Sequence, residues 1–210
     1  METTESRLPC KRPYELGKRR EASDRTREAV LTAARELLES GGARDLTMEA
    51  LAKASGVTRQ TIHNLFVTKT GVLEALFDRI AADAGMMRMR EVMTSSDAES
   101  MLAAFVAVFA GFWGKDRLLL KRVHGIAAID PEFGRAVEAR NQRRKMAASR
   151  VIERIHAGRQ EMEPGETGRK IAILVALTSF EFFDALAESC GSAEAAEGLI
   201  YPIVKKVVAP

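Results

Sequence analysis

A stretch of hydrogen-bonding side chains between residues 59 and 64 is the part of this chain best suited to chemistry with a partner. Its donors and acceptors are Arg59, Gln60, Thr61, His63 and Asn64. Thr58 can cap a helix here, because its side-chain oxygen can accept a backbone N–H that a helix start leaves unpaired. With Val57, Ile62 and Phe66 turned inward, such a helix presents its polar side outward, as a reader of the DNA major groove does.

A second short helix is expected immediately before this one. Thr47 can cap it, and Leu51 and Ala52 give it a small apolar face. Gly56 lies where a tight turn between two helices needs a positive φ, which glycine adopts without steric cost. The pattern favours a helix-turn-helix, although an ordinary helical hairpin in a larger α-helical domain is the alternative on pattern alone.

Further residues around this helix pair recur at the spacing of a known domain. They are Ala34, Leu37, Gly42, Leu46, Thr47, Leu51, Ala52, Gly56, Val57, Thr58, Thr61, Ile62, Phe66, Lys69 and Leu73. The stretch from about Arg27 to Phe77 resembles the N-terminal DNA-binding domain of the TetR (tetracycline-repressor) family of bacterial transcription regulators. Two positions depart from that pattern, because His63 replaces a usual tyrosine and Thr70 a usual acidic residue. A histidine can still donate to a phosphate, which would make that contact sensitive to pH.

The resemblance implies a homodimer that places two recognition helices in successive major grooves of a near-palindromic DNA operator. The candidate base readers are Arg59, Gln60, Thr61 and Asn64. The candidate phosphate contacts are Thr47, Thr58, His63 and Lys69. A lysine in the first turn of a helix opposes the helix dipole, so the position of Lys69 favours a role facing a phosphate. Repression of transcription is the family default.

The N-terminal residues 1–23 are predicted to form a flexible basic arm, because Pro9, Pro13 and Gly17 would break any helix. The candidate DNA contacts of this arm are Lys18, Arg19 and Arg20. Such an arm can approach phosphates or enter a minor groove and release counterions. A solvated tail is the alternative interpretation, and the two are compatible if the arm orders only on DNA.

The composition of the 210-residue chain, 46% hydrophobic and 29% charged, is that of a soluble globular protein. No apolar run reaches membrane-spanning length, and the polar start METTESRLPCKRP lacks the apolar core of a secretion signal. We therefore expect a cytoplasmic protein with no membrane partner. The net charge of +3 is compatible with nucleic-acid binding without requiring it.

Enzymatic and metal-binding patterns are missing from the sequence. It contains no nucleophile motif, no glycine-rich phosphate loop and no dinucleotide fingerprint. The cysteines and histidines are too scattered for a metal cluster: Cys10, Cys190, His63, His124 and His156. We expect no catalytic residue, no metal and no cofactor, and hence no enzyme.

Apolar residues recur at helical spacing, and no segment shows a sustained alternation of apolar and polar residues. This pattern predicts an all-α fold. A three-helix DNA-binding domain with a connecting helix, residues 24–93, would be followed by a helical ligand-binding and dimerisation domain, residues 94–210. After a first helix from Asp24 to about Ser40, the later expected helices are Lys69–Met89, Asp97–Trp113, Asp116–Ile129, Pro131–Ala157, Ile171–Leu186 and Ser192–Val208.

The second domain is interpreted as a receptor for a small-molecule effector, because bulky groups on its helices could enclose an apolar cavity. The candidate pocket residues are Phe105, Phe109, Trp113, His124, Phe180 and Phe183. Ordinary core packing is the competing interpretation for each of them. Arg140, Arg143 and Arg144 could attract an anionic ligand, although such a run is more typical of a solvated helix face.

The helix predicted at Ile171–Leu186 is apolar on nearly every face, so it must be buried on more than one side. The last two helices, about residues 170–208, would pair with a second copy in a four-helix interface. A monomer with a buried last hairpin is the alternative.

A ligand would then favour a dimer whose recognition helices have the wrong separation, with the Lys69–Met89 helix as the lever. The rival functions are a DNA-binding regulator without a small-molecule effector, and an all-helical interaction module or enzyme.

Overall fold

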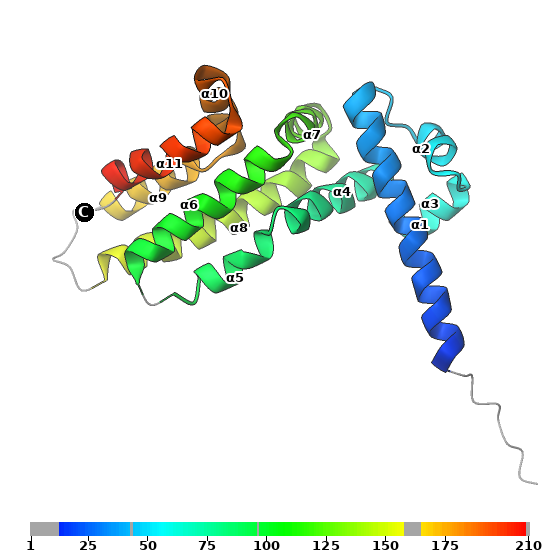
Figure 1. Ribbon diagram of the computed structural model, residues 1–210, viewed down its shortest axis with the longest axis horizontal. Helices are drawn as coiled ribbons and strands as arrows, with labels where there is room; N and C mark the ends of the chain where they lie inside the picture. The colour runs from blue at the N-terminus through cyan, green and yellow to red at the C-terminus, as the bar shows by residue number, and fades with distance from the viewer. Residues whose placement is uncertain (1–12, 43, 96, 158–164, 209–210) are drawn as a thin grey trace, which may run out of the picture.

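The computed structural model describes residues 13–42, 44–95, 97–157 and 165–208, and within these ranges the chain forms helices and no strand (Figure 1). The predicted all-α fold is confirmed. The helices are α1 Pro13–Ser40, α2 Met48–Ser55, α3 Arg59–Phe66, α4 Lys69–Asp83, η1 Met86–Arg88, α5 Met89–Val92, α6 Ala98–Lys115, α7 Arg117–Ile129, α8 Pro131–His156, α9 Glu166–Leu177, α10 Phe180–Cys190 and α11 Ala193–Val208.

The helices follow one another across an elongated molecule (Figure 1). Figure 1 shows α2 and α3 against α1 at one end, and α9, α10 and α11 at the other. Between them lie α4, α6, α7 and α8, and α4 contacts both α1 and α8. The division of the chain at about residue 93 stays a prediction.

Local capping fixes the starts of the helices around the helix-turn-helix, as predicted. The side-chain oxygens of Thr47, Thr58 and Thr68 each accept a backbone N–H three residues on, at 3.1, 3.1 and 3.0 Å. Gly56 adopts a φ of 70° between α2 and α3. Behind these caps, fully buried apolar side chains from α1 to α4 form one core, including Val30, Leu38, Leu51, Ile62 and Leu73.

The predicted start of the first helix at Asp24 is wrong, because α1 begins at Pro13. Proline is tolerated in the first turn, where its missing N–H would have no intrahelical partner. Gly17 continues the helix at a modest cost in backbone entropy. Residues 1–12 of the predicted arm lie outside the described part of the chain.

The helix predicted to run from Lys69 to Met89 ends earlier, at Asp83. Gly85 adopts a φ of 75°, a left-handed conformation that stops an α-helix and redirects the chain into η1 and α5. The lever helix is therefore shorter than expected, and Met86, Met87 and Met89 lie beyond its end.

The single helix predicted at Ile171–Leu186 is two helices, α9 and α10, that meet at Thr178 and Ser179. Ser179 caps α10 by accepting the backbone N–H of Phe182 at 3.1 Å. The buried indole Nε1 of Trp113 donates to the Thr178 carbonyl at 3.0 Å, so a tertiary contact from α6 satisfies the carbonyl at the break.

The expectation that no apolar run reaches membrane-spanning length is wrong for α6. Within the described residues, α6 is one helix that is long and apolar enough to cross a membrane by length and composition. Here it packs against α8, α10 and α11. Phe105, Phe109 and Phe112 are buried among these helices, which is the position of a core helix.

The hydrogen bond between Trp113 and Thr178 gives a test of the break between α9 and α10. Trp113→Phe keeps an aromatic ring but leaves the buried carbonyl without its donor, so we expect a loss of about 1–3 kcal/mol in the free energy of unfolding. Urea denaturation measures it, with the exposed substitution Lys145→Gln as control. An unchanged unfolding midpoint for Trp113→Phe would contradict a stabilising role of the hydrogen bond between Trp113 and the Thr178 carbonyl.

Candidate DNA-reading surface and ligand cavity

Helix α3 carries its polar side chains on the outside and its apolar side chains on the inside. Ile62 and Phe66 are buried, and the guanidinium of Arg27 on α1 lies 4.6 Å from the centre of the Phe66 ring. Arg59, Gln60, His63 and Asn64 are exposed and Thr61 is half-buried. We call these five residues the reading face. Its exposed donors and acceptors are what direct recognition of base edges requires.

Weak contacts orient the side chains of the reading face and leave them available to bind DNA. Gln60 Nε2 donates to Asn64 Oδ1 at 2.9 Å, one helical turn along α3. Arg59 forms an ion pair with Glu49 of α2 at 2.6 Å, and both side chains are about two-thirds exposed, at 65% and 64%. Exposed pairs of this kind contribute little free energy, so DNA can replace them. Glu49 was not singled out in the sequence because its partner lies on another helix.

The predicted phosphate contacts lie at the starts of three helices that pack on one another. Thr47, Thr58 and Lys69 lie at or beside the N-termini of α2, α3 and α4, and α3 contacts both of the other helices. Helix N-termini offer unpaired N–H groups and partial positive charge, which suit phosphate oxygens. His63, the fourth predicted contact, is exposed on α3 itself.

A strained turn sets the position of α4 relative to α3. Val67 has a φ of 64°, which is rare for a β-branched residue, and Thr68 N donates to Phe66 O at 2.7 Å across it. A Cβ on Gly71 would lie 2.0 Å from the same Phe66 oxygen, so only glycine fits there. The turn holds Lys69 close to α3. Sequence reasoning missed Val67 and Gly71, since neither changes the helical pattern.

Lys18, Arg19 and Arg20 lie on the exposed N-terminal half of α1 and not on a flexible arm. Figure 1 shows this half of α1 extending beyond α3, away from α2. The structure therefore does not bring these three residues to the reading face. Contact with DNA through them stays a prediction.

A cavity of about 400 Å³ lies between α4, η1, α6, α7 and α8. Of the predicted pocket residues, Phe109, Trp113 and His124 line it. Phe105, Phe180 and Phe183 do not line it, because these rings are buried in the core beside it, and their part in a ligand site stays a prediction. Phe180 stacks on the His124 ring, with ring centres 4.5 Å apart. Arg140, Arg143 and Arg144 also line the cavity. Its volume is in the range of small-molecule binding sites.

His124 connects the cavity to an acidic side chain of α10. Its Nδ1 lies 3.3 Å from Glu181 Oε1. The hydrogen bond from His124 lowers the pKa of Glu181 to about 2, although partial burial opposes the shift. Glu181 therefore stays ionised at neutral pH and fixes the orientation of the imidazole that faces the cavity.

Comparison with known proteins identifies the helix-turn-helix region. Residues 30–76 match the model for bacterial regulatory proteins of the tetR family. This part of the chain is therefore a DNA-binding domain of the TetR type. A relative, the HTH-type transcriptional regulator EthR of Mycobacterium tuberculosis, is 29% identical over 115 residues, 54% of this chain and 53% of EthR. The chain thus spans about half the length of the curated TetR-family relatives it matches.

Solved structures share the fold over nearly the whole chain. A TetR transcription regulator from Haloarcula marismortui has a TM-score of 0.68 at 18% identity, covering 89% of this chain and 97% of that one. NalD, the secondary repressor of the MexAB-OprM multidrug efflux pump in Pseudomonas aeruginosa, has a TM-score of 0.66 at 17% identity, covering 90% and 98%. These likenesses establish a TetR-like architecture.

The reading face and the α4 start predict different effects on DNA binding. Lys69→Ala removes one phosphate contact, so it should weaken binding to every sequence and reduce the slope of log K against log salt by about 1. Gln60→Ala should instead cost about 1–3 kcal/mol on the preferred sequence and relax the preference at one base pair. Fluorescence anisotropy at several salt concentrations measures both.

Lys145→Ala is the matched control for the loss of one positive charge, because Lys145 is exposed on α8 and lies outside the predicted DNA contacts and the predicted dimer surface. It should leave the salt slope unchanged. If Lys69→Ala behaved like this control, Lys69 would not face a phosphate.

Proposed function

We propose that the protein is a sequence-specific DNA-binding transcriptional regulator: a dimeric repressor that a small-molecule ligand releases from a near-palindromic operator. The reading face is the observation that carries the proposal, because its polar side chains are exposed while the back of α3 is locked into a buried core. The DNA-binding domain of the TetR type supports a regulator and not an enzyme. EthR carries the name of a transcriptional regulator, and NalD that of a repressor.

The far end of the molecule supports a dimer through about residues 170–208. Large apolar side chains remain accessible on α11, where Leu199 and Val207 are 44% and 45% exposed. Leu177, Phe182 and Leu186 on α9 and α10 are only half-buried. A second copy related by a two-fold axis would cover this surface and set the spacing between the two reading faces.

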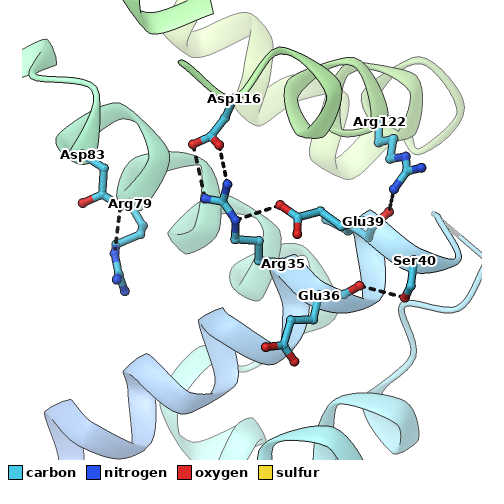
Figure 2. Close-up of polar contacts among 9 residues, drawn as sticks. Arg35, Glu36, Glu39, Ser40, Arg79, Asp83, Asp116 and Arg122 are labelled. Carbon is cyan, nitrogen blue, oxygen red and sulfur yellow. Dashed lines mark hydrogen bonds and ion pairs between the residues drawn. The ribbon is translucent and has the colours of Figure 1, made fainter. Parts of the chain in front are cut away.

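Helix α7 contacts α1 through Asp116 and Arg122 (Figure 2), and it also contributes His124 to the cavity. Asp116, at the start of α7, accepts two hydrogen bonds from Arg35 of α1, one of them at 3.2 Å. Arg122, two turns further along α7, donates to the Leu38 carbonyl near the end of α1. His124, two residues beyond Arg122, lines the cavity. The same helix therefore touches the ligand site and the helix on which α3 packs.

The contact between Asp116 and Arg35 replaces a helix cap. Asp116 occupies the N-cap position of α7, yet its side chain makes no capping hydrogen bond because both oxygens face Arg35. Losing such a cap costs about 1 kcal/mol, so the ion pair must offset it. The hydrogen bond with Asp116 raises the pKa of Arg35 above its ordinary value.

Helix α4 offers a second connection, as the sequence suggested. Arg79 on α4 pairs with Glu28 on α1, and its neighbour Asp78 lines the cavity. Ligand binding can therefore act on α1 through α7 and through α4. A shift of either helix would change the separation of the reading faces in a dimer, and a coupling of about 1–3 kcal/mol would reduce operator occupancy.

Selection of bound fragments from random DNA at two salt concentrations tests the proposed function. We expect enrichment of a near-palindrome whose half-sites lie about one helical turn or slightly more apart, with steep salt dependence. Binding without an enriched sequence would overturn the proposal, because the reading face would then not contact bases.

The contact of α7 with α1 predicts non-additive effects on operator affinity. Arg35→Ala and Asp116→Ala should each change the affinity by about threefold or more, and the double variant should change it no more than the larger single effect. Gln142→Ala, which breaks an exposed hydrogen bond with Glu138 within α8, is the control and should stay near wild type. Additive or absent effects in anisotropy titrations would remove α7 from the coupling.

A further inference from the structure

Two buried polar atoms have no hydrogen-bond partner within the described ranges, and both belong to residues that line the cavity. They are Nε of Arg144 and Nε2 of His124. A buried donor or acceptor without a partner is destabilising, because water that bound it in the unfolded chain has been lost. Because both residues line one cavity, a polar ligand group there is a candidate partner.

Arg144 is a buried cation, and none of the acidic side chains among the described residues pairs with it. The residue is 8% exposed, and its guanidinium donates to the Val175 carbonyl at 2.6 Å and, at 3.4 Å, to Asn141 Oδ1. Burial lowers the pKa of Arg144, while Glu181 and Glu138 raise it only from a distance. No carboxylate contacts Arg144 in the part of the chain described, so a ligand anion could compensate its charge.

The other charged groups at the cavity leave its net charge positive. Arg140 is already paired with Asp78, with a shortest distance of 2.6 Å, and Asp78 is the one acidic side chain in the described lining. Arg143 also lines the cavity and is otherwise exposed. The described lining therefore holds three guanidinium groups and one carboxylate, and Glu74, outside the lining, adds a second carboxylate 3.8 Å from Arg140.

Most of the remaining lining is apolar, with Asn141 and His124 as its polar members, and α6 contributes an aromatic wall. Phe109, Phe112 and Trp113 come from this helix, and Phe77 comes from α4. The Arg144 guanidinium lies 5.8 Å from the centre of the Phe109 ring, so the cation lies beside the aromatic wall. A ligand that fits must combine one anionic end with an apolar body.

We propose that the cavity binds an amphiphilic monocarboxylate, with its carboxylate on Arg144 and its apolar chain against Phe109, Phe112 and Trp113. Guanidinium matches a carboxylate with paired hydrogen bonds, and such charge-assisted bonds are short and strong. Because His124 Nδ1 donates to Glu181, Nε2 of the neutral imidazole is an acceptor and suits an N–H or O–H of a ligand, so the carboxylate is assigned to Arg144 alone. The identification of this ligand class as the effector rests on the proposed function, whereas binding itself does not.

Isothermal titration calorimetry of the full chain with three ten-carbon probes tests the ligand class. The probes are decanoate, decan-1-ol and decyltrimethylammonium, which share the apolar chain and differ in the charge of the head. We expect decanoate to bind about tenfold or more tightly than decanol, and the cation weakest. Equal binding of decanoate and decanol, or preference for the cation, would overturn the proposal without any variant.

Substitution of Arg144 then assigns the preference to this side chain. Arg144→Met should reduce decanoate affinity about tenfold or more while decanol binding persists. Arg150→Gln, an exposed arginine of α8 outside the cavity lining, is the control and should leave both affinities unchanged. If Arg144→Met does not fold by circular dichroism, Arg143→Gln should still lower the ratio of decanoate to decanol affinity, and an unchanged ratio would contradict the proposal.

DNA selection on the same preparation separates the two proposals. Arg144-dependent decanoate binding without an enriched DNA sequence would leave the ligand class standing and remove the regulatory function. Enrichment of an operator sequence, together with equal binding of decanoate and decanol, would support the regulatory function and overturn the proposed ligand class.

Discussion

The contact between α1 and α7 is the constraint on which the position of the DNA-reading surface depends. One side of α1 contributes Val30 and Leu38 to the helix-turn-helix core. Another side holds α7 through Arg35 and Asp116, and Arg122 fixes the end of α1 (Figure 2). Because the Asp116 side chain is only 13% exposed, its separation from Arg35 would leave a mostly buried carboxylate unpaired. A shift of α7 is therefore expected to move α1, and with it α3.

The two proposed binding sites hold the groups that would bind their partners in opposite environments, exposed on α3 and buried in the cavity. Each environment suits the partner proposed for that site. On α3 most polar groups are exposed, and their contacts, Gln60 with Asn64 and Arg59 with Glu49 of α2, are weak, so exchange for bases or phosphates costs little. In the cavity, Arg144 is buried beside apolar rings and lacks a carboxylate partner within the described residues. Buried charge interacts strongly with an anion because little water screens it. The first arrangement permits sliding and sequence reading, and the second favours a single class of ligand.

Features decided by local chemistry could be predicted from the sequence, and features decided by packing could not. The predicted caps at Thr47 and Thr58 depend on residues three positions away, and the structure confirms them. The break at Thr178 depends on Trp113 from a distant helix, and it was missed. For the pocket, the aromatic content of α6 was informative, but which rings face the cavity depends on how the bundle packs. The pairing of Asp116 with Arg35 has no sequence signal, since capping would explain an aspartate there equally well.

The central claim is that occupancy of the cavity and occupancy of the operator are coupled. Thermodynamic reciprocity requires that each ligand change the affinity for the other by the same factor. The direct measurement is calorimetric titration of decanoate into the free protein and into its complex with the selected operator. We predict weaker decanoate binding to the complex, by the factor with which saturating decanoate weakens operator binding. Equal affinity for the free and the operator-bound protein would contradict the coupling.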